Sequence, residues 1–494
     1  MQNETKKISK NTATYFIANA ITKVAAFFLI PVYTIFLTPE EYGMLNIIGV
    51  TANFLFIFFI LGLKGAIRRF SFDFEDQSIG QKKLIGIITI FTFIIGGTLS
   101  IFLTLFGNKI FPFFFKNTPF FPYLFTAIWI AFFRIAHQIK LVIFQVRQQA
   151  FFYTLLDSGF ILANILLTIV VVVLFKKGLT GKIYLDFFLI ALFSVISTIL
   201  LIKDIKINFN LKLLKEPLKF ALPLIPHMLS GFLLAAIDKI FIERITGLND
   251  VGLYSLAFNI GMILYMFIEA IRLSYTPYFN KMVIKEGDSA KPKFAKLTTY
   301  GFLLYSVAGI FLILFSKELI TIIANKEYYL SYSVLPIIIL TNVFNGLYFF
   351  FVRPLLFFKN ATIYVSIATL STAVVNIILN YFFIKNFGMI GAAWATFISI
   401  IIKVILIVIF AQKKYFIKYE IKRLLILTFL IVVSIMFFYF SEIIETSIIK
   451  MIALKTLFFV LIAISFIFTR FFDKKEIKTA HKTISNFKEK YFSK

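Results

Sequence analysis

The stretch TPEEYGMLNIIGVTANFLFIFFILG, residues 38–62, decides the fold. A short turn with two acidic residues is followed by an apolar run that, at ~1.5 Å per helical residue, can cross the ~30 Å hydrocarbon core of a membrane. About fourteen runs of comparable length recur along the chain. They lie at roughly 12–38, 43–63, 84–107, 119–145, 150–175, 183–202, 218–245, 250–276, 297–316, 329–355, 361–384, 389–411, 424–441 and 453–472. The sequence therefore predicts an all-α integral membrane protein with about fourteen transmembrane helices.

The composition excludes a water-soluble protein. Of the 494 residues, 60% are hydrophobic and only 15% are charged, whereas soluble domains carry about 25% charged residues. The chain has no Cys, which excludes disulfides and thiolate-bound metals.

The net charge of +27 is explained by topology. Most Lys and Arg residues fall in alternate loops that include both termini, so the positive-inside rule predicts that both termini are cytoplasmic. That face should attract anionic membrane lipids. Because the basic residues are scattered over short segments, we expect no nucleic acid partner.

The chain also contains an internal repeat. TPEEYGML (38–45) matches GLNDVGLY (247–254) with an offset of 209 residues, and GLTG (178–181) matches GMIG (388–391) with an offset of 210. NILL (164–167) and NIIL (376–379) follow with an offset of 212. Each copy covers an even number of spans, so the two copies should have the same orientation in the membrane and be related by an axis along the bilayer normal.

This duplication predicts two parallel six-helix lobes with a substrate path between them, as an alternating-access transporter needs. The predicted segments are a cytoplasmic N-terminal tail, an N-lobe, a cytoplasmic linker, a C-lobe, two extra helices and a cytoplasmic C-terminal tail, at 1–11, 12–202, 203–217, 218–411, 424–472 and 473–494.

Several stretches resemble one known family, the polysaccharide flippases (Wzx-type). Its superfamily also contains the multidrug–cation antiporters (MATE-like fold) and the peptidoglycan-lipid flippase. The resemblance covers about 10–412 and rests on six motifs. These are TPEEYG (38–43), GLKGAIRRF (62–70), ALPLIP (221–226), DKIFI (238–242), GLNDVGLYSLA (247–257) and NIILNYFFIKNFGMIGAAWAT (376–396).

The resemblance implies a transporter and not an enzyme. Its substrate would be an isoprenoid-diphosphate-linked oligosaccharide, moved from the cytoplasmic to the periplasmic leaflet of a bacterial inner membrane for O-antigen, capsule or a related surface polysaccharide. It further implies coupling to an H⁺ or Na⁺ gradient with no other cofactor, and a functional monomer that works beside a polysaccharide polymerase or chain-length regulator. A multidrug or small-solute/cation antiporter of the same fold stays open as the alternative.

Basic residues are the candidates for substrate binding. Lys23 lies near the middle of the first span, where an ammonium suits a diphosphate or an acidic sugar, or else reaches the interface or a distant acid. Arg68 and Arg69 follow the second span, where guanidinium groups could capture the diphosphate or simply obey the positive-inside rule. Lys403 in the twelfth span is a further candidate.

Two acidic residues inside spans are the candidates for ion coupling or gating. Asp238 and Lys239 are neighbours in the seventh span, so they should point apart and pair with other helices. We expect Asp238 to couple a cation or form a gate, and Lys239 to contact substrate, unless both are structural. Glu269 and Arg272 can pair on one helix face, either structurally or with Glu269 carrying a proton.

Three amides and one histidine complete the candidates. Asn376 and Asn380 form a polar stripe that could touch sugar or join helices, and Asn164 repeats Asn376 in the other half. His137, next to Arg134 on one helix face, could titrate near neutral pH. No metal-ligand spacing is found, so we expect no metal site.

Overall fold

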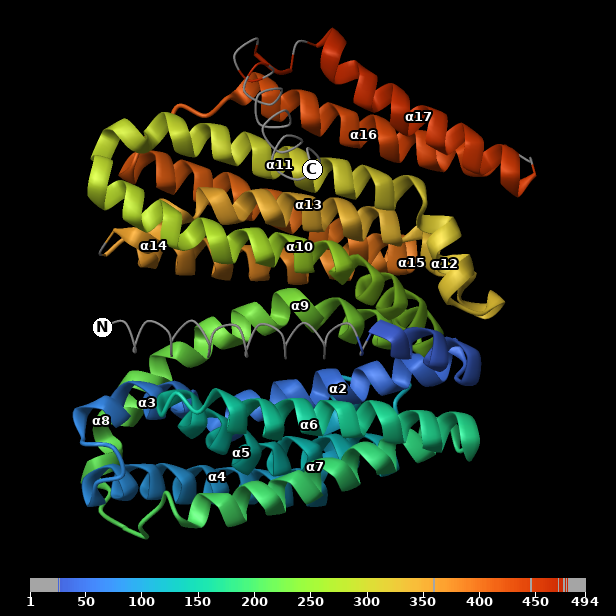
Figure 1. Cartoon of the computed structure of the whole chain (residues 1–494). Coiled ribbons are helices and arrows are strands. Elements are labelled where there is room, and N and C mark those ends of the chain that lie inside the picture. Colours follow the sequence, from blue (N-terminus) through green and yellow to red (C-terminus); the bar gives the residue numbers. More distant parts are fainter. Residues whose placement is uncertain are drawn as a thin grey trace, which may run out of the picture. The chain divides into compact units, whose positions relative to one another are not determined.

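The computed structural model describes residues 25, 27–358, 360–444, 447–469, 471–473, 476 and 478. These residues form helices and connecting segments, without a strand among them. They fall into two compact units (Figure 1). The first unit comprises the described residues up to Ile260, together with Ile320–Val334 and Asn360–Ile407. The second comprises Gly261–Leu319, Leu335–Lys359 and the described residues from Val408.

The first unit contains the helices that hold the candidate site. Its α-helices are α2 (Pro39–Ile60), α3 (Leu63–Phe70), α4 (Ile79–Ile110), α5 (Phe125–Val146), α6 (Ala150–Thr168), α7 (Gly178–Ile202), α8 (Lys212–Ala221) and α9 (Ile225–Ile245). Short 3-10 or π segments are η1 (Ser71–Asp73), η2 (Phe111–Phe113), η3 (Phe120–Leu124), η4 (Ile169–Leu174), η5 (Leu222–Leu224) and η7 (Lys326–Ser333). Helix α5 is central, because it packs against α2, α4, α6 and α7.

The second unit is built around α11 (Lys291–Leu314), which packs against α13 (Leu335–Phe351), α16 (Ile421–Ile443) and α17 (Ile448–Phe468). It also contains α12 (Ser316–Ile323, as far as Leu319), η6 (Gly287–Ala290) and α14 (Arg353–Phe357). Two long helices, α10 (Leu248–Glu286) and α15 (Thr362–Lys414), run through both units.

The turn at 38–43 begins α2 with standard capping chemistry. The Thr38 side chain accepts from the Glu41 amide at 3.2 Å, and the Glu41 carboxylate accepts from the Thr38 amide at 3.0 Å. Pro39 occupies the first turn, where its missing N–H costs nothing. The helix ends at Ile60. Leu61 and Gly62 follow with left-handed φ values, and α3 begins at Leu63.

The apolar runs form helices of membrane-spanning length and composition. Nine helices of the described part are long and apolar enough to cross a bilayer, or up to eleven if each of two bent pairs counts as one span. Two of the nine, Leu248–Leu314 and Thr362–Lys414, have 67 and 53 residues, more than two crossings of ~20 residues need. Because nine to eleven candidate spans are found among the described residues, the predicted number of fourteen helices is not confirmed. Outward-facing side chains such as Leu105 and Phe188 remain exposed, as they would against lipid hydrocarbon.

Two predicted boundaries differ from the structure. The loop expected at 277–296 is helical up to Glu286, because α10 continues through Pro277 before the short turn η6. The break expected near 385–388 is compressed to one residue, Gly388, with φ +56° and ψ −140°. A glycine adopts this conformation without steric penalty, so the chain reverses there without a polar loop.

The internal repeat is visible in the contacts of two glycines. Gly178 begins α7 with φ +55°, and its missing Cβ would lie 3.6 Å from the Glu41 carboxylate. Gly388 has φ +56°, and its missing Cβ would lie 3.8 Å from the Asp250 carboxylate. Both pairs match the aligned repeat positions. Each half of the duplication therefore places a carboxylate, Glu41 or Asp250, against a left-handed glycine at the aligned position.

Candidate functional site

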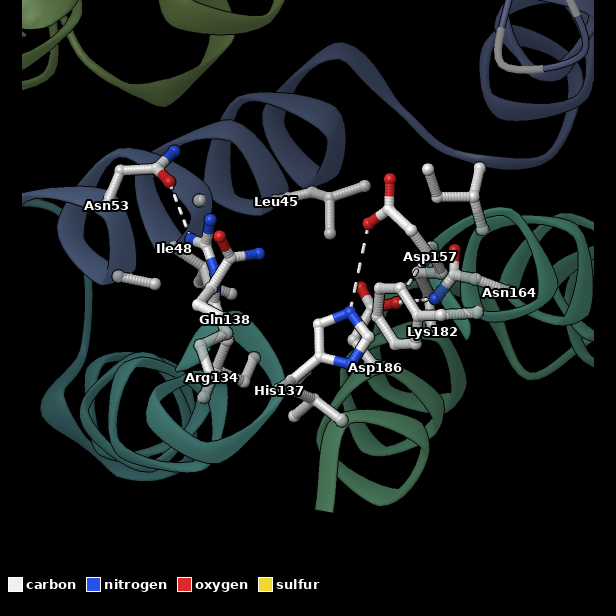
Figure 2. Close-up of a pocket in the computed structure, with 16 residues that line it drawn as sticks. Leu45, Ile48, Asn53, Arg134, His137, Gln138, Asp157, Asn164, Lys182 and Asp186 are labelled. Atoms are coloured by element: carbon white, nitrogen blue, oxygen red, sulfur yellow. Dashed lines mark hydrogen bonds and ion pairs between the residues drawn. The ribbon is translucent and has the colours of Figure 1, made fainter. Parts of the chain in front are cut away.

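A cavity of about 440 Å³ lies inside the first unit, between α2, α5, α6 and α7 (Figure 2). Its volume is within the range of ligand pockets. Its lining mixes apolar side chains with charges of both signs. The lining residues are Leu45, Ile48, Gly49, Ala52, Asn53, Ile130, Arg134, His137, Gln138, Asp157, Phe160, Ile161, Asn164, Lys182, Asp186 and Ile190.

One side of this cavity is lined by a cationic group held by amides. The Arg134 guanidinium donates to Asn53 Oδ1 at 2.7 Å and lies over the Phe56 ring, 4.8 Å from its centroid. Next to it, Lys64 Nζ donates to Gln138 Oε1 at 2.5 Å. Both cations are thus held by neutral acceptors, which leaves their charge available to an anionic ligand.

The middle of the cavity contains a histidine and a carboxylate. His137 is buried, and its Nε2 lies 3.8 Å from Asp157 Oδ1 while its Nδ1 lies 3.4 Å from Ser197 Oγ. The Nε2 atom has no hydrogen-bond partner. A buried ring nitrogen without a partner costs free energy unless a solute or water satisfies it, so this part of the cavity is built for a polar occupant.

The opposite side holds an ammonium–carboxylate pair. Lys182 Nζ forms a salt bridge with Asp186 one helical turn along α7 and donates to Asn164 Oδ1 at 3.2 Å. The Asn164 amide nitrogen donates to Asp186 Oδ1 at 2.6 Å. In Figure 2 this cluster faces Asn53 and Arg134 across the cavity, with His137 between them.

A second polar site surrounds the fully enclosed Asp238 of α9. Its carboxylate accepts from Tyr254 at 2.6 Å, from Thr396 at 2.7 Å and from Asn380 Nδ2 at 2.7 Å. Asn380 Nδ2 also donates to Asn376 Oδ1 at 3.1 Å. The remaining acceptor, Asn380 Oδ1, is buried and has no hydrogen-bond partner.

The structure brings together three of the predicted site residues, namely Asp238, Asn376 and Asn380. Lys239 points away from them, donates to Asn46 of α2 at 3.0 Å and lies over the Phe258 ring. Asp238 therefore hydrogen-bonds to α10 and α15, whereas Lys239 hydrogen-bonds to α2, so the two neighbours point apart as their spacing predicts.

The other predicted residues lie elsewhere. Arg68 donates to Gln145 at 2.8 Å, and Arg69 pairs with Asp73 at 2.7 Å on an exposed surface. Glu269 and Arg272 form the predicted i, i+3 pair in the second unit, with Arg272 Nε 2.7 Å from Glu269 Oε2. Lys23 lies outside the described residues.

Sequence reasoning missed most of the cavity's charges. Asp157, Lys182 and Asp186 were not singled out, although Asp157 and Asp186 lie inside predicted spans, where a carboxylate is costly and therefore informative. The i, i+4 spacing of Lys182 and Asp186 would have marked a pair on one face of α7. In the described part of the chain, no group of three or more His, Cys, Asp or Glu residues could hold a metal ion.

Comparison with known proteins identifies relatives for this arrangement. The chain is 22% identical to protein 1 of the Lsg locus of Haemophilus influenzae over 331 residues, which cover 65% of this chain and 78% of that protein. It is 25% identical to an uncharacterised membrane protein of the same organism over 286 residues, 56% of this chain and 66% of the other.

Solved structures show the same fold. The lipid II flippase MurJ in an inward closed conformation superposes with a TM-score of 0.73 at 18% identity, covering 92% of this chain and 98% of that one. An inward-facing multidrug resistance MATE family transporter of the MOP superfamily gives a TM-score of 0.59 at 16% identity, covering 80% and 94%. These matches confirm the predicted MATE-like fold, and the proteins that share it are a flippase and a transporter, not enzymes.

Family models agree with the sequence resemblance. The MatE model matches residues 223–382, within the second copy of the repeat. The model described as "Polysaccharide biosynthesis protein" matches residues 8–283, more than half of the chain. The chain therefore belongs to the polysaccharide biosynthesis protein family.

Proposed function

We propose that the protein is a flippase for an isoprenoid-diphosphate-linked oligosaccharide, which it moves from the cytoplasmic to the periplasmic leaflet of a bacterial inner membrane. The observation that supports this most directly is the charged cavity inside a bundle of apolar spans. Charged groups within spans cost about 2.5–3.5 kcal/mol each even on lenient scales. Five ionisable side chains around one cavity are therefore best explained by a polar cargo.

The cavity chemistry suits a glycan with an anionic end. Asn53, Gln138 and Asn164 offer amides for sugar hydroxyls, and Phe160 offers a ring face. Arg134 supplies a guanidinium that donates to the neutral amide of Asn53, so it can attract phosphate or an acidic sugar. The isoprenoid tail would stay in lipid while the two predicted lobes alternate access between the two faces of the membrane, and this cavity, which lies within the first lobe, would bind the polar end. Lys23, Arg68, Arg69 and Lys239 remain proposed cationic contacts of the substrate.

We further propose that the cycle is driven by a cation, H⁺ or Na⁺, at Asp238. All three hydrogen-bond donors to this carboxylate are neutral. The unpartnered Asn380 Oδ1 supplies a second buried oxygen beside it. A carboxylate with amide and hydroxyl oxygens is a suitable donor set for a hard cation. Glu269 is the second candidate for proton coupling.

A flipping assay tests this function directly. Purified full-length protein in liposomes should move a fluorescent isoprenoid-diphosphate oligosaccharide to the opposite leaflet, and an Arg134→Ala/Asp157→Ala double variant should slow it about tenfold or more. The matched control is Lys293→Ala, which removes one partner of an exposed salt bridge with Glu286. Intact flipping in the double variant would contradict the role of the cavity.

The drug–cation antiporter remains the second candidate because the cavity also contains two carboxylates. Asp157 and Asp186 are each about a quarter exposed, so they could attract a cationic solute. A deletion strain separates the two functions. Loss of surface polysaccharide with unchanged drug sensitivity supports the flippase, and the reverse result supports the antiporter.

The proposed setting is that of a multi-pass inner membrane protein with both termini cytoplasmic. It would act as a monomer, with lipid-linked oligosaccharide and anionic lipids as its ligands and a polysaccharide polymerase or chain-length regulator as its functional neighbour. O-antigen and capsule are the proposed destinations of the glycan.

A further inference from the structure

Each half of the duplication holds a carboxylate against an asparagine inside a spanning helix bundle; Asp186 in the first half is about a quarter exposed and Asp238 in the second is buried. In the first half, Asn164 Nδ2 donates to Asp186 Oδ1 at 2.6 Å between α6 and α7. In the second half, Asn380 Nδ2 donates to Asp238 Oδ1 at 2.7 Å. Asn164 aligns with Asn376, which lies one turn from Asn380 and contacts it.

The register of the last helix in each half agrees with this comparison. The offset of 210 residues that aligns Gly178 with Gly388 also aligns Asp186 with Thr396. Asn376 Nδ2 donates to Thr396 Oγ1 at 3.2 Å, which repeats the contact of Asn164 with Asp186. The two polar sites therefore lie at equivalent places in the two halves.

The sites differ in charge. In the first half, the ammonium of Lys182 pairs with Asp186 and donates to Asn164 Oδ1. In the second half, Asp238 receives hydrogen bonds from neutral donors, and Asn380 Oδ1 has no partner. An amide oxygen and a carboxylate oxygen thus contact a cation in the first half. In the second half the aligned Asn376 accepts from Asn380, and the unsatisfied amide oxygen beside the Asp238 carboxylate is that of Asn380, one helical turn further along α15.

We propose that the Lys182 ammonium is a built-in cation that occupies, in the first half, the position a mobile monovalent cation takes in the second. This inference rests on the proposed coupling at Asp238. It assigns one coupling cation to each transport cycle, because the first-half site is already filled by a covalently attached charge. It also predicts that Asp186 and Asn164 can bind a free cation once the Lys182 ammonium that contacts them is removed.

Removing the amine should open that site. Without Lys182, the Asp186 carboxylate would be left without its counter-ion in a spanning helix, which is strongly unfavourable unless a cation or proton enters. The cavity of about 440 Å³ beside it gives a hydrated cation access. The other ionisable groups that face this cavity are Arg134, His137 and Asp157, and none of them is salt-bridged to Asp186 among the described contacts.

The experiment measures cation-dependent thermal stability of the full-length protein in lipid nanodiscs. The probes are Na⁺ at fixed pH, with choline replacing it at constant ionic strength, and H⁺ at fixed Na⁺. All Lys182 variants are made in an Asp238→Asn background, which removes the second-half carboxylate charge. We expect Asp238→Asn alone to lose the cation response of the wild type.

The double variant Asp238→Asn/Lys182→Ala should regain a saturable response to Na⁺ or H⁺ over a concentration range in which Asp238→Asn shows none. Lys182→Arg in the same background keeps the charge and should regain nothing. Adding Asp186→Asn to the double variant should abolish the gain. Lys182→Met, which keeps the side-chain volume without the charge, guards against a folding defect specific to alanine, and monodisperse elution shows that each variant is folded.

Two results would overturn the proposal. One is the absence of any cation response in both the folded Ala and Met variants, and the other is an equal gain with Lys182→Arg. A wild type that responds to neither cation would instead contradict coupling at Asp238, and the comparison of Ala with Arg would still decide the role of Lys182.

Discussion

Gly43 and Gly252, the aligned glycines of the two repeats, meet backbone to backbone. A Cβ on Gly43 would lie 2.0 Å from the carbonyl oxygen of Leu248, and a Cβ on Gly252 would lie 1.9 Å from that of Pro39. Pro39 and Leu248 are themselves separated by the repeat offset of 209 residues. Each glycine therefore packs against the first helical residue of the other half: Gly43 against Leu248 of α10, and Gly252 against Pro39 of α2.

This close packing predicts that Gly43→Ala and Gly252→Ala each destabilise the protein. The new methyl group would overlap backbone atoms, which cannot rotate away, so the helix starts must separate at a cost of about 1–3 kcal/mol or more. Thermal unfolding in detergent checks this. Gly159→Ala in α6 is the control, because nothing lies within 4 Å of its Cβ position, and an unchanged melting temperature in both glycine variants would contradict the packing argument.

Glu243 predicts a second measurable effect. This fully buried carboxylate at the end of α9 accepts from the amides of Lys116 and Asn117, at 3.0 and 2.6 Å, and from the Thr118 hydroxyl at 3.0 Å. Hydrogen bonds to a charged group are worth about 1.5–3 kcal/mol each. Glu243→Ala should therefore raise amide hydrogen exchange in 111–118 about tenfold or more.

The control for that measurement is Lys109→Ala, which changes an exposed residue of the preceding helix. Unaltered exchange at Lys116 and Asn117 in the Glu243 variant would show that the segment is held by other contacts.

Lys455 predicts a large loss of stability in the second unit. Its ammonium is fully buried, 2.8 and 3.0 Å from the two oxygens of Glu318 and 3.4 Å from Glu442. Truncating one member of a buried ion pair costs about 3–5 kcal/mol, because the partner carboxylates lose a buried counter-ion. Glu442 keeps its salt bridge with Lys317. Lys455→Ala should lower the melting temperature sharply, whereas Lys450→Ala at an exposed position of α17 should not. Equal effects of the two variants would sink the prediction.

Glu476 predicts that its contacts with Arg423 and Tyr300, next to the end of α17, weaken in acid. Burial opposes its charge, but hydrogen bonds from Arg423 and Tyr300 and from the Asp473 amide lower its pKa from 4.5 to about 2. A carboxyl group whose pKa is lower in the folded state stabilises fully above its unfolded value and loses that contribution as the pH falls through the folded value. The stabilising contribution should therefore be complete above pH 4.5 and fade towards pH 2.

Thermal unfolding of wild type and Glu476→Gln between pH 6 and 3 checks this window. The two curves should differ most at the upper end and converge on acidification. Asp288→Asn at an exposed position is the control. A difference that grows in acid would mean that the sign is wrong.

The sequence predicted the fold because membrane spans and repeats are properties of the chain read in order. Length and hydropathy identify spans without knowledge of their neighbours, and the match of GLTG with GMIG located Gly178 and Gly388 correctly. The loop expected at 277–296 failed because polar residues there lie on a helix that continues beyond the apolar run.

The candidate site was harder to predict because it depends on which helix faces meet. The sequence shows Asp238, Asn376 and Asn380 as isolated polar residues in apolar runs. Only the contacts between α9 and α15 show that Asn380 and Thr396 both donate to the Asp238 carboxylate. The span predicted at 183–202 begins after Lys182, so the sequence places this lysine outside the apolar run. Only the approach of α6 shows that its amine is enclosed with Asp186.

The reciprocal contact of Gly43 and Gly252 has a consequence for how such a chain can arise. In a symmetric homodimer, one patch meets its own copy, so residue i touches j′ while j touches i′. Pro39, Gly43, Leu248 and Gly252 satisfy that relation within a single polypeptide. A subunit with half the spans would already present a self-complementary surface, and joining two copies would need only a connecting segment such as 203–211. After such a fusion the two halves could diverge, so that the first half keeps the Lys182 ammonium where the second half keeps a site for a mobile cation at Asp238.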